Sequence, residues 1–111
     1  MFVAMNRFKV KDGSEAAFEE MWRSRESHLD GMKGFVEFKL LRGPNDSDEG
    51  FTLYASHTTW ASKQDFIDWT KSEQFRKAHA GAGKSKVQYM GHPQLEAFDA
   101  VEGTVIQSDA A

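Results

Sequence analysis

The first hydrophobic pattern along the chain alternates with a period of two and predicts a β-strand over residues 2–10. One face of this strand carries Phe2, Ala4, Asn6, Phe8 and Val10. Asn6 is the only polar member of that face. A buried amide without hydrogen-bond partners costs about 1 to 3 kcal/mol, so Asn6 is either paired locally or directed at a ligand.

A helical period follows the first strand. Ser14 is a candidate N-cap, and Glu15 places a negative charge in the first helical turn, where it interacts favourably with the helix dipole. A core-facing stripe at spacings of three and four residues is formed by Phe18, Met21, Trp22, Arg25 and Leu29. The pattern predicts a helix that ends at Gly31.

The middle of the chain predicts an antiparallel hairpin. The first strand is "GFVEFKLLRG", with Val36, Phe38 and Leu40 on one face, and the second is "FTLYASHTTW". Between them, "GPNDSDEG" at residues 43–50 contains glycine, proline, asparagine and aspartate. These residue types favour turns, so we expect a long acidic loop at the tip of the hairpin.

Two short helices and a last strand are predicted for the second half. Ser62 and Asp65 form a capping box, which predicts a helix over residues 62–70. Ser72 can start a second short helix that continues to residue 80. A glycine-rich loop then leads to the strand "QLEAFDAV". We expect a single domain over residues 1–101, with a flexible tail over 102–111.

The order strand, helix, strand, strand, helix, strand indicates an α+β protein. It is the split βαβ order of the ferredoxin-like fold, in which helices cover one face of a four-stranded antiparallel sheet. The other face of the sheet would be bare in a monomer. If that face is apolar, as the aromatic content suggests, it needs a cover, and a second copy is the simplest one, so we expect a homodimer.

Composition and charge exclude several classes of protein. The 111 residues suffice for one core, and a hydrophobic content of 40% is that of a globular protein. The net charge of −3, with acids and bases interspersed, argues against nucleic-acid binding. The absence of cysteine excludes disulfides, thiolate metal sites and a cysteine nucleophile. No apolar run approaches the roughly 18 residues of a membrane span, and the alternating start is not a signal peptide, so we expect the cytoplasm.

The segment "FIDWTKSEQFRKAHA" contains the candidate chemistry. Phe75 and His79 are one helical turn apart and therefore share a face. His79 can be either a partly buried histidine bonded to a backbone carbonyl or a functional group. Trp69 can likewise be a core residue. Taken singly, neither residue indicates a function, and the same holds for Asn6.

Taken together, three residues resemble a known family. Asn6 in the first strand, Trp69 in "DWTKSEQF" and His79 in "RKAHA", ten residues after that tryptophan, are similar to the haem-degrading monooxygenases of bacterial iron acquisition. These belong to the antibiotic-biosynthesis-monooxygenase family of dimeric α+β barrels. The resemblance covers nearly the whole chain. It includes "GFVEFKLLR" and the run of Trp60, Ser62, Phe66 and Trp69.

The resemblance implies a role for each of these residues. His79 would bind the haem iron, Trp69 would press on the macrocycle, and Asn6 would hydrogen-bond an oxygen species on the other side of the iron. Haem would be both substrate and cofactor, and its ring would be opened with release of iron. The electrons would come from an external donor through a reductase, because no G-x-G-x-x-G motif follows any predicted strand.

Further residues are assigned to the same pocket. Trp22 and Phe75 would contact the haem, and Arg25 would meet a propionate or tune the pocket's polarity. For Arg25 the alternative is a stem that lies along the core while the charged head reaches solvent. Gly81 and Gly83 would let the loop after His79 move and form an entrance.

Two other functions remain open at this point. A cofactor-free monooxygenase of aromatic polyketides or quinols would use the same cavity, with His79 as a general base. A haem-binding module without turnover would use the same ligand but leave it intact. The fold alone does not choose among the three functions.

Overall fold

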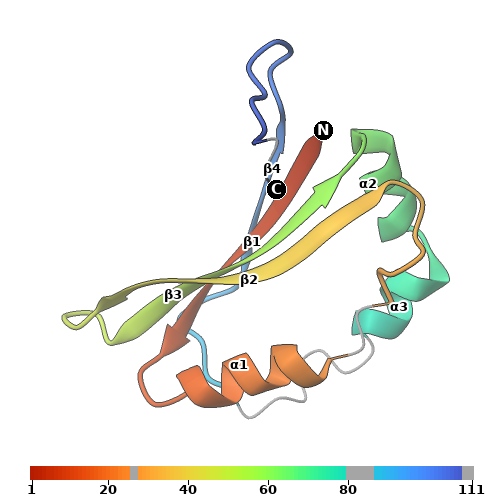
Figure 1. The fold of residues 1–111 in the computed structure, drawn as a ribbon. Helices are drawn as coiled ribbons and strands as arrows, with labels where there is room; N and C mark the ends of the chain where they lie inside the picture. The colour runs from red at the N-terminus through yellow and green to blue at the C-terminus, as the bar shows by residue number, and fades with distance from the viewer. Residues whose placement is uncertain (26–27, 80–86, 109–111) are drawn as a thin grey trace.

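The computed structural model describes residues 1–25, 28–79 and 87–108. Along the chain the elements are β1 (Phe2–Lys11), α1 (Glu15–Ser24), β2 (Phe35–Asp46), β3 (Phe51–Trp60), α2 (Lys63–Thr70), α3 (Glu73–His79) and β4 (Gln94–Asp99). This order confirms the predicted α+β class and ferredoxin-like topology, including the second helix that restarts after Ser72. Figure 1 shows the three helices along one side of a single curved sheet.

The sheet is antiparallel, in the order β2-β3-β1-β4. Strands β1 and β3 are central and pair without a register shift from Phe2 opposite Trp60 to Lys11 opposite Phe51. The shorter β4 pairs with the first part of β1 only. The central strands therefore fix which side chains point toward the helices.

The core under the helices is divided into two clusters. One contains the buried residues Phe2, Ala4, Leu29 and Trp60. The other contains Val10, Phe18, Tyr54 and Val87. Between them, on the same face of β1 and β3, lie the directly paired residues Asn6 and Ser56. The inner face of the sheet is thus apolar at both ends and polar in the middle.

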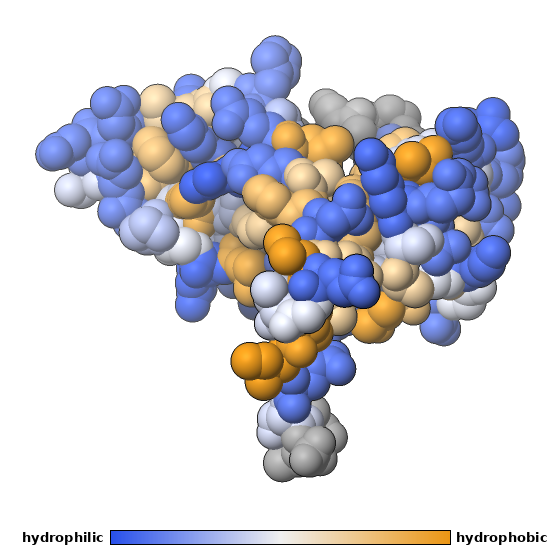
Figure 2. Space-filling view, turned by 90° about the horizontal axis from the view of Figure 1, so that it is seen from above, coloured by the Kyte–Doolittle hydropathy of each residue, from blue (hydrophilic) through white to orange (hydrophobic). Residues whose placement is uncertain are grey.

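The outer face of the sheet carries no helix (Figure 1). Alternation places Val3 and Met5 of β1 and Leu53 and Ala55 of β3 there. An ion pair of 3.2 Å joins Arg7 to Glu96 on the same face. Figure 2, seen from above, shows hydrophobic side chains among hydrophilic ones across the molecule and along a projecting segment.

Helix α1 is shorter than predicted. It ends at Ser24, and Arg25 already has an extended backbone with φ −74° and ψ 133°. Leu29 still reaches the core, but it does so from the connection to β2. Helical spacing of apolar residues indicates which side chains are buried. It overestimated the length of α1 because Leu29 is buried by the connection after the helix.

The capping of α1 also differs from the expectation. The Ser14 side chain makes no cap hydrogen bond, and its hydroxyl oxygen instead accepts from the Gln88 N–H at 3.2 Å. This bond ties the start of the helix to the segment that precedes β4. The Glu15 carboxylate accepts from the Gly13 N–H at 2.7 Å instead. The first turn therefore retains a side-chain acceptor.

Strand β2 is longer than predicted and less regular. The segment expected to be loop from residue 43 continues as strand to Asp46, with a register shift between Arg42 and Asn45. Pro44 is tolerated because β2 is an edge strand and carries a bulge there. A second shift, between Phe35 and Glu37, lies next to Val36, whose side chain is 58% exposed.

Two predicted segments, the C-terminal tail and the loop after His79, lie partly or wholly outside the described residues. Residues 102–108 are exposed, and Ile106 is 94% exposed, but the expected flexibility of the tail stays a prediction. Gly81 and Gly83, the predicted entrance loop, lie outside the described residues. Within the described ranges, no helix is long and apolar enough to cross a membrane.

The capping box at α2 is confirmed. The Ser62 hydroxyl oxygen accepts from the Asp65 N–H at 3.1 Å, and the hydroxyl donates to the Asp65 carboxylate at 2.9 Å. Asp65 is buried against Gly34, which has φ +77°. The Gly34 carbonyl in turn accepts from the Ala61 N–H at 2.7 Å. The start of α2 is therefore fixed to the chain entering β2.

A comparison of Gly31 and Gly34 distinguishes the cost of backbone strain from the cost of disturbing the contact between Gly34 and Asp65. Gly31 (φ +84°) has open space where a Cβ would stand, whereas a Cβ on Gly34 would overlap the Asp65 carboxylate. Gly31→Ala should cost about 1 to 2 kcal/mol, the penalty of a left-handed non-glycine residue. Gly34→Ala should cost clearly more in urea unfolding. Equal losses for the two variants would show that Asp65 moves aside without cost.

Candidate functional site

A pocket lies between the sheet and the helices, at the gap between the two core clusters. The structure brings all six predicted site residues to its lining: Asn6, Trp22, Arg25, Trp69, Phe75 and His79. They come from β1, from α1 and its C-terminal end, from α2 and from α3. Their convergence is a property of the fold, because they span most of the chain's length.

The floor of the pocket is the polar middle of the sheet. Asn6 of β1 lies directly opposite Ser56 of β3, and Thr58 follows two residues along on the same face. The Thr58 hydroxyl donates to the Ala4 carbonyl at 3.4 Å. Ser56 and Thr58 were not among the residues predicted for the site. They are spaced two residues apart between Tyr54 and Trp60, and this period of two could have placed them on the same face of β3.

The opposite wall is aromatic and comes from α2 and α3. The Phe75 ring lies 4.8 Å from the Trp69 ring, edge to face, and 4.1 Å from the His79 ring, stacked. Ser72 starts α3 by accepting from the Phe75 N–H at 3.1 Å. Helix α3 thereby holds the phenyl and imidazole rings one turn apart, as predicted.

The tautomer of His79 follows from its hydrogen bond. Its Nδ1 lies 2.7 Å from the Phe75 carbonyl oxygen. A carbonyl can only accept, so Nδ1 carries the proton and donates. Nε2 then keeps its lone pair. An imidazole oriented by a backbone carbonyl is the usual arrangement of a histidine metal ligand, but it is equally the bond expected of a structural histidine.

A cation lies at the α1 side of the pocket. The Trp22 ring stacks on Phe38 at 5.4 Å, and the Arg25 guanidinium lies 4.5 Å from the Trp22 ring centroid. Burial lowers the pKa of the half-buried Arg25, although a guanidinium stays charged in proteins. The Arg25 head thus lines the pocket, and it does not extend freely into solvent.

Two indole groups in this pocket have unused donors. Nε1 of Trp22 and Nε1 of Trp69 are buried and have no hydrogen-bond partner among the residues that the structure describes. Such a donor normally finds a partner, because leaving it unpaired costs about 1 to 3 kcal/mol. A ligand with acceptor atoms at its edge would supply the missing bonds.

The donor set limits the kind of metal that this pocket can hold. In the described part of the chain, no group of three or more His, Cys, Asp or Glu side chains is placed to bind a metal ion. His79 Nε2 can offer one ligand. One imidazole between aromatic walls suits a metal that arrives with its other ligands in a planar frame.

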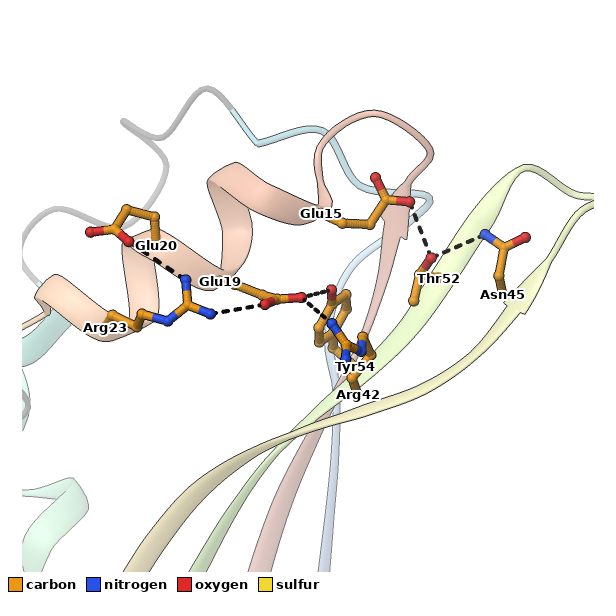
Figure 3. Close-up of polar contacts among 8 residues, drawn as sticks. All are labelled: Glu15, Glu19, Glu20, Arg23, Arg42, Asn45, Thr52 and Tyr54. Atoms are coloured by element: carbon orange, nitrogen blue, oxygen red, sulfur yellow. Dashed lines mark hydrogen bonds and ion pairs between the residues drawn. The ribbon is translucent and has the colours of Figure 1, made fainter.

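A polar network holds α1 against the sheet next to the pocket (Figure 3). The Tyr54 hydroxyl of β3 donates to the Glu19 carboxylate at 2.5 Å. Arg42 of β2 and Arg23 of α1 each donate to the same carboxylate at 3.1 Å. Because Trp22 follows Glu19 by three residues, this network also sets the position of the Trp22 ring.

The network changes the ionisation of both of its central groups. Burial, reinforced by the Glu19 carboxylate, raises the pKa of Tyr54 to about 12. The hydrogen bond from Tyr54 lowers the pKa of Glu19, and the two arginines lower it further. At neutral pH the pair is therefore a neutral phenol and a carboxylate.

The remaining histidines lie elsewhere. His57 is on the outer face of the sheet, where it pairs with Met5 and Lys39. Its Nδ1 is buried without a partner. His28 and His92 are absent from the pocket lining. Their positions agree with the choice of His79 as the candidate ligand.

The chain was compared with known families and proteins. Residues 1–81 match the family model "Antibiotic biosynthesis monooxygenase". A haem oxygenase (staphylobilin-producing) from Staphylococcus saprophyticus subsp. saprophyticus is 32% identical over 88 residues, which are 78% of this chain and 80% of the relative.

Two solved structures have a fold similar to that of this chain. The haem degrader MhuD from Mycobacterium tuberculosis, with two haems bound in its active site, has a TM-score of 0.68 and 26% identity, covering 91% of this chain and 96% of MhuD. SnoaB, a cofactor-independent oxygenase from Streptomyces nogalater, has a TM-score of 0.64 and 18% identity, covering 93% of this chain and 95% of SnoaB. The likeness to SnoaB concerns the fold alone.

The Glu19 network yields a test of how α1 is held. Glu19→Gln should destabilise the protein at neutral pH, because the amide keeps the shape but loses the charge. The folded-state pKa of Glu19 is lowered from 4.5, so its stabilisation is complete above that value and is lost as the pH falls through the lowered pKa. Urea unfolding at pH 7 and pH 3 should therefore show a gap from wild type that narrows in acid.

Glu20→Gln is the matched control, since Glu20 is exposed and forms a long ion pair of 3.6 Å with the exposed Arg23. It should change stability little at either pH. A Glu19→Gln gap that is the same at pH 7 and pH 3 would contradict the role of the charge.

Proposed function

This chain belongs to the antibiotic biosynthesis monooxygenase family, and we propose that it is a haem-degrading monooxygenase. It binds haem, oxidises it with dioxygen and external electrons, opens the porphyrin ring and releases iron. The observation that carries the proposal is His79, whose Nδ1 is held by the Phe75 carbonyl while Nε2 keeps its lone pair in a pocket shared with Asn6 and Trp69.

The side chains of the pocket fit the edge and faces of a haem. Aromatic walls suit the macrocycle, the Arg25 cation suits a propionate, and the two unpaired indole N–H groups suit acceptor oxygens. The cavity of about 170 Å³ is smaller than the range of about 300 to 1,000 Å³ that is typical for drug-sized ligands. Haem therefore either projects from the pocket or pushes the helices outward.

The pocket residues would bind and orient the haem during the reaction. Bound haem supplies the iron that activates dioxygen and is itself the molecule that is oxidised. His79 would hold the iron through Nε2, because the Phe75 carbonyl binds Nδ1–H and so keeps the tautomer in which Nε2 has a free lone pair. Asn6 offers amide donors on the sheet side of the pocket. Trp69 and Phe75, whose rings are in edge-to-face contact, would together form the apolar wall against which the macrocycle lies.

The partners follow from the same chemistry. The electrons come from an external donor through a reductase, which we place with this chain in the cytoplasm. A second copy of the chain covers the outer face of the sheet and forms a homodimer. The support for this partner is a face without helices that carries Val3, Met5, Leu53 and Ala55, interspersed with polar side chains.

A second candidate function is a cofactor-free monooxygenase acting on an aromatic polyketide or quinol. The observation in its favour is the cavity of about 170 Å³, which suits a smaller organic substrate. In that case His79 Nε2 would act as a general base. A haem-binding module without turnover differs from the enzyme only in what happens after binding.

A haemin titration followed by ascorbate in air, with catalase present, tests these functions. The enzyme should show a Soret band that saturates near one haem per chain and then decays to a new chromophore. Saturation without decay when the proposed reductase is also supplied would indicate a binding module. The absence of saturable binding would favour the cofactor-free enzyme.

Variants of the pocket separate the roles of its residues. His79→Ala should abolish ordered haem binding, with His92→Ala, outside the pocket, as the control. Asn6→Ala should keep haem binding but lose turnover, measured as Soret decay. Normal decay in Asn6→Ala would remove Asn6 from the mechanism. Trp69→Phe should slow the reaction, and unchanged kinetics would assign Trp69 to packing alone.

A further inference from the structure

The floor of the pocket contains the Ser56 hydroxyl, which makes no hydrogen bond to any other residue that the structure describes. Ser56 lies opposite Asn6 in the register of β3 and β1. We propose that Ser56 is a second hydrogen-bond donor on the sheet side of the haem pocket and that it contacts the same iron ligand as Asn6. The proposal rests on the proposed function, because it assumes that haem enters this pocket.

The register places the two side chains together. Directly paired residues of antiparallel strands point to the same face, with Cβ atoms about 4.5 to 5.5 Å apart. Both Asn6 and Ser56 line the pocket. A group bound between them would lie within hydrogen-bond reach of both. Neither β1 nor β3 has a register shift along their pairing, so the two donors stand on a rigid part of the sheet.

The Ser56 hydroxyl is free to take this role. Ser56 is only 9% exposed, yet within the described part of the chain its side chain has no hydrogen-bond partner. Its neighbour on the same face provides the contrast, because the Thr58 hydroxyl already donates to the Ala4 carbonyl. The Asn6 amide likewise has no side-chain partner there, so both groups are available to a ligand.

The chemistry of the site suits two donors. His79 lies on the wall opposite the sheet, and Asn6 and Ser56 lie on the sheet side of the same pocket, so a haem held by His79 would have both donors across from its ligand. Small ligands on that face carry partial or full negative charge, and both the amide N–H and the hydroxyl O–H can donate to them. Ser56 then shares with Asn6 the orientation of the ligand relative to the ring.

Two spectroscopic measurements on haem-loaded protein, neither of which requires turnover, test the role of Ser56. Fluoride binding to the ferric form and the carbon monoxide stretch of the ferrous form both report donors next to the iron ligand. Ser56→Ala should weaken fluoride binding roughly tenfold, as expected for one hydrogen bond to a charged group. It should also shift the carbon monoxide stretch to higher frequency. Ser56→Thr, which keeps a hydroxyl, should stay close to wild type.

Controls distinguish this role from a general disturbance of the sheet. Asn6→Ala should shift both readouts in the same direction, and the double variant should shift them further. Thr59→Val removes a hydroxyl from the opposite face of β3 and should shift neither. If Asn6→Ala shifts both readouts while Ser56→Ala matches wild type, the proposal for Ser56 is overturned and the proposed function stands. Absence of haem binding by the wild type would overturn both.

Discussion

The division of the core into two apolar clusters is the constraint on which the rest of the structure depends. Phe2 and Trp60 anchor one cluster and Val10 and Tyr54 the other, on the same two central strands. The helices pack on these ends and leave the middle of the sheet open. Because Asn6 occupies that middle, the fold places polar donors where a cavity forms and keeps apolar side chains where the helices close.

The site depends on contacts that lie outside it. Glu19 ties α1 to β3 and β2 through Tyr54 and Arg42, which sets the wall that carries Trp22. His79 is oriented by a carbonyl of its own helix, so its position depends on where α3 begins. The pocket therefore depends both on hydrogen bonds between elements, as at α1, and on hydrogen bonds within a single helix, as at α3.

The fold by itself does not decide the chemistry. The same architecture occurs in a haem degrader and in a cofactor-independent oxygenase, at TM-scores of 0.68 and 0.64. The function must therefore be argued from side chains. An imidazole with one nitrogen held by a backbone carbonyl and unpaired donors on the walls and floor suit a flat ligand that brings its own metal and acceptor atoms.

The sequence alone determined the class and the order of elements, because periodicity and caps such as Ser62 are local properties. The six candidate residues that line the pocket were chosen through the resemblance to a family, because taken singly none of them indicated a function. The predicted end of α1 and the predicted end of β2 were wrong, since the burial of Leu29 and a bulge on an edge strand depend on tertiary neighbours. Only the tertiary structure set Ser56 opposite Asn6, because strand register is a relation between residues fifty positions apart.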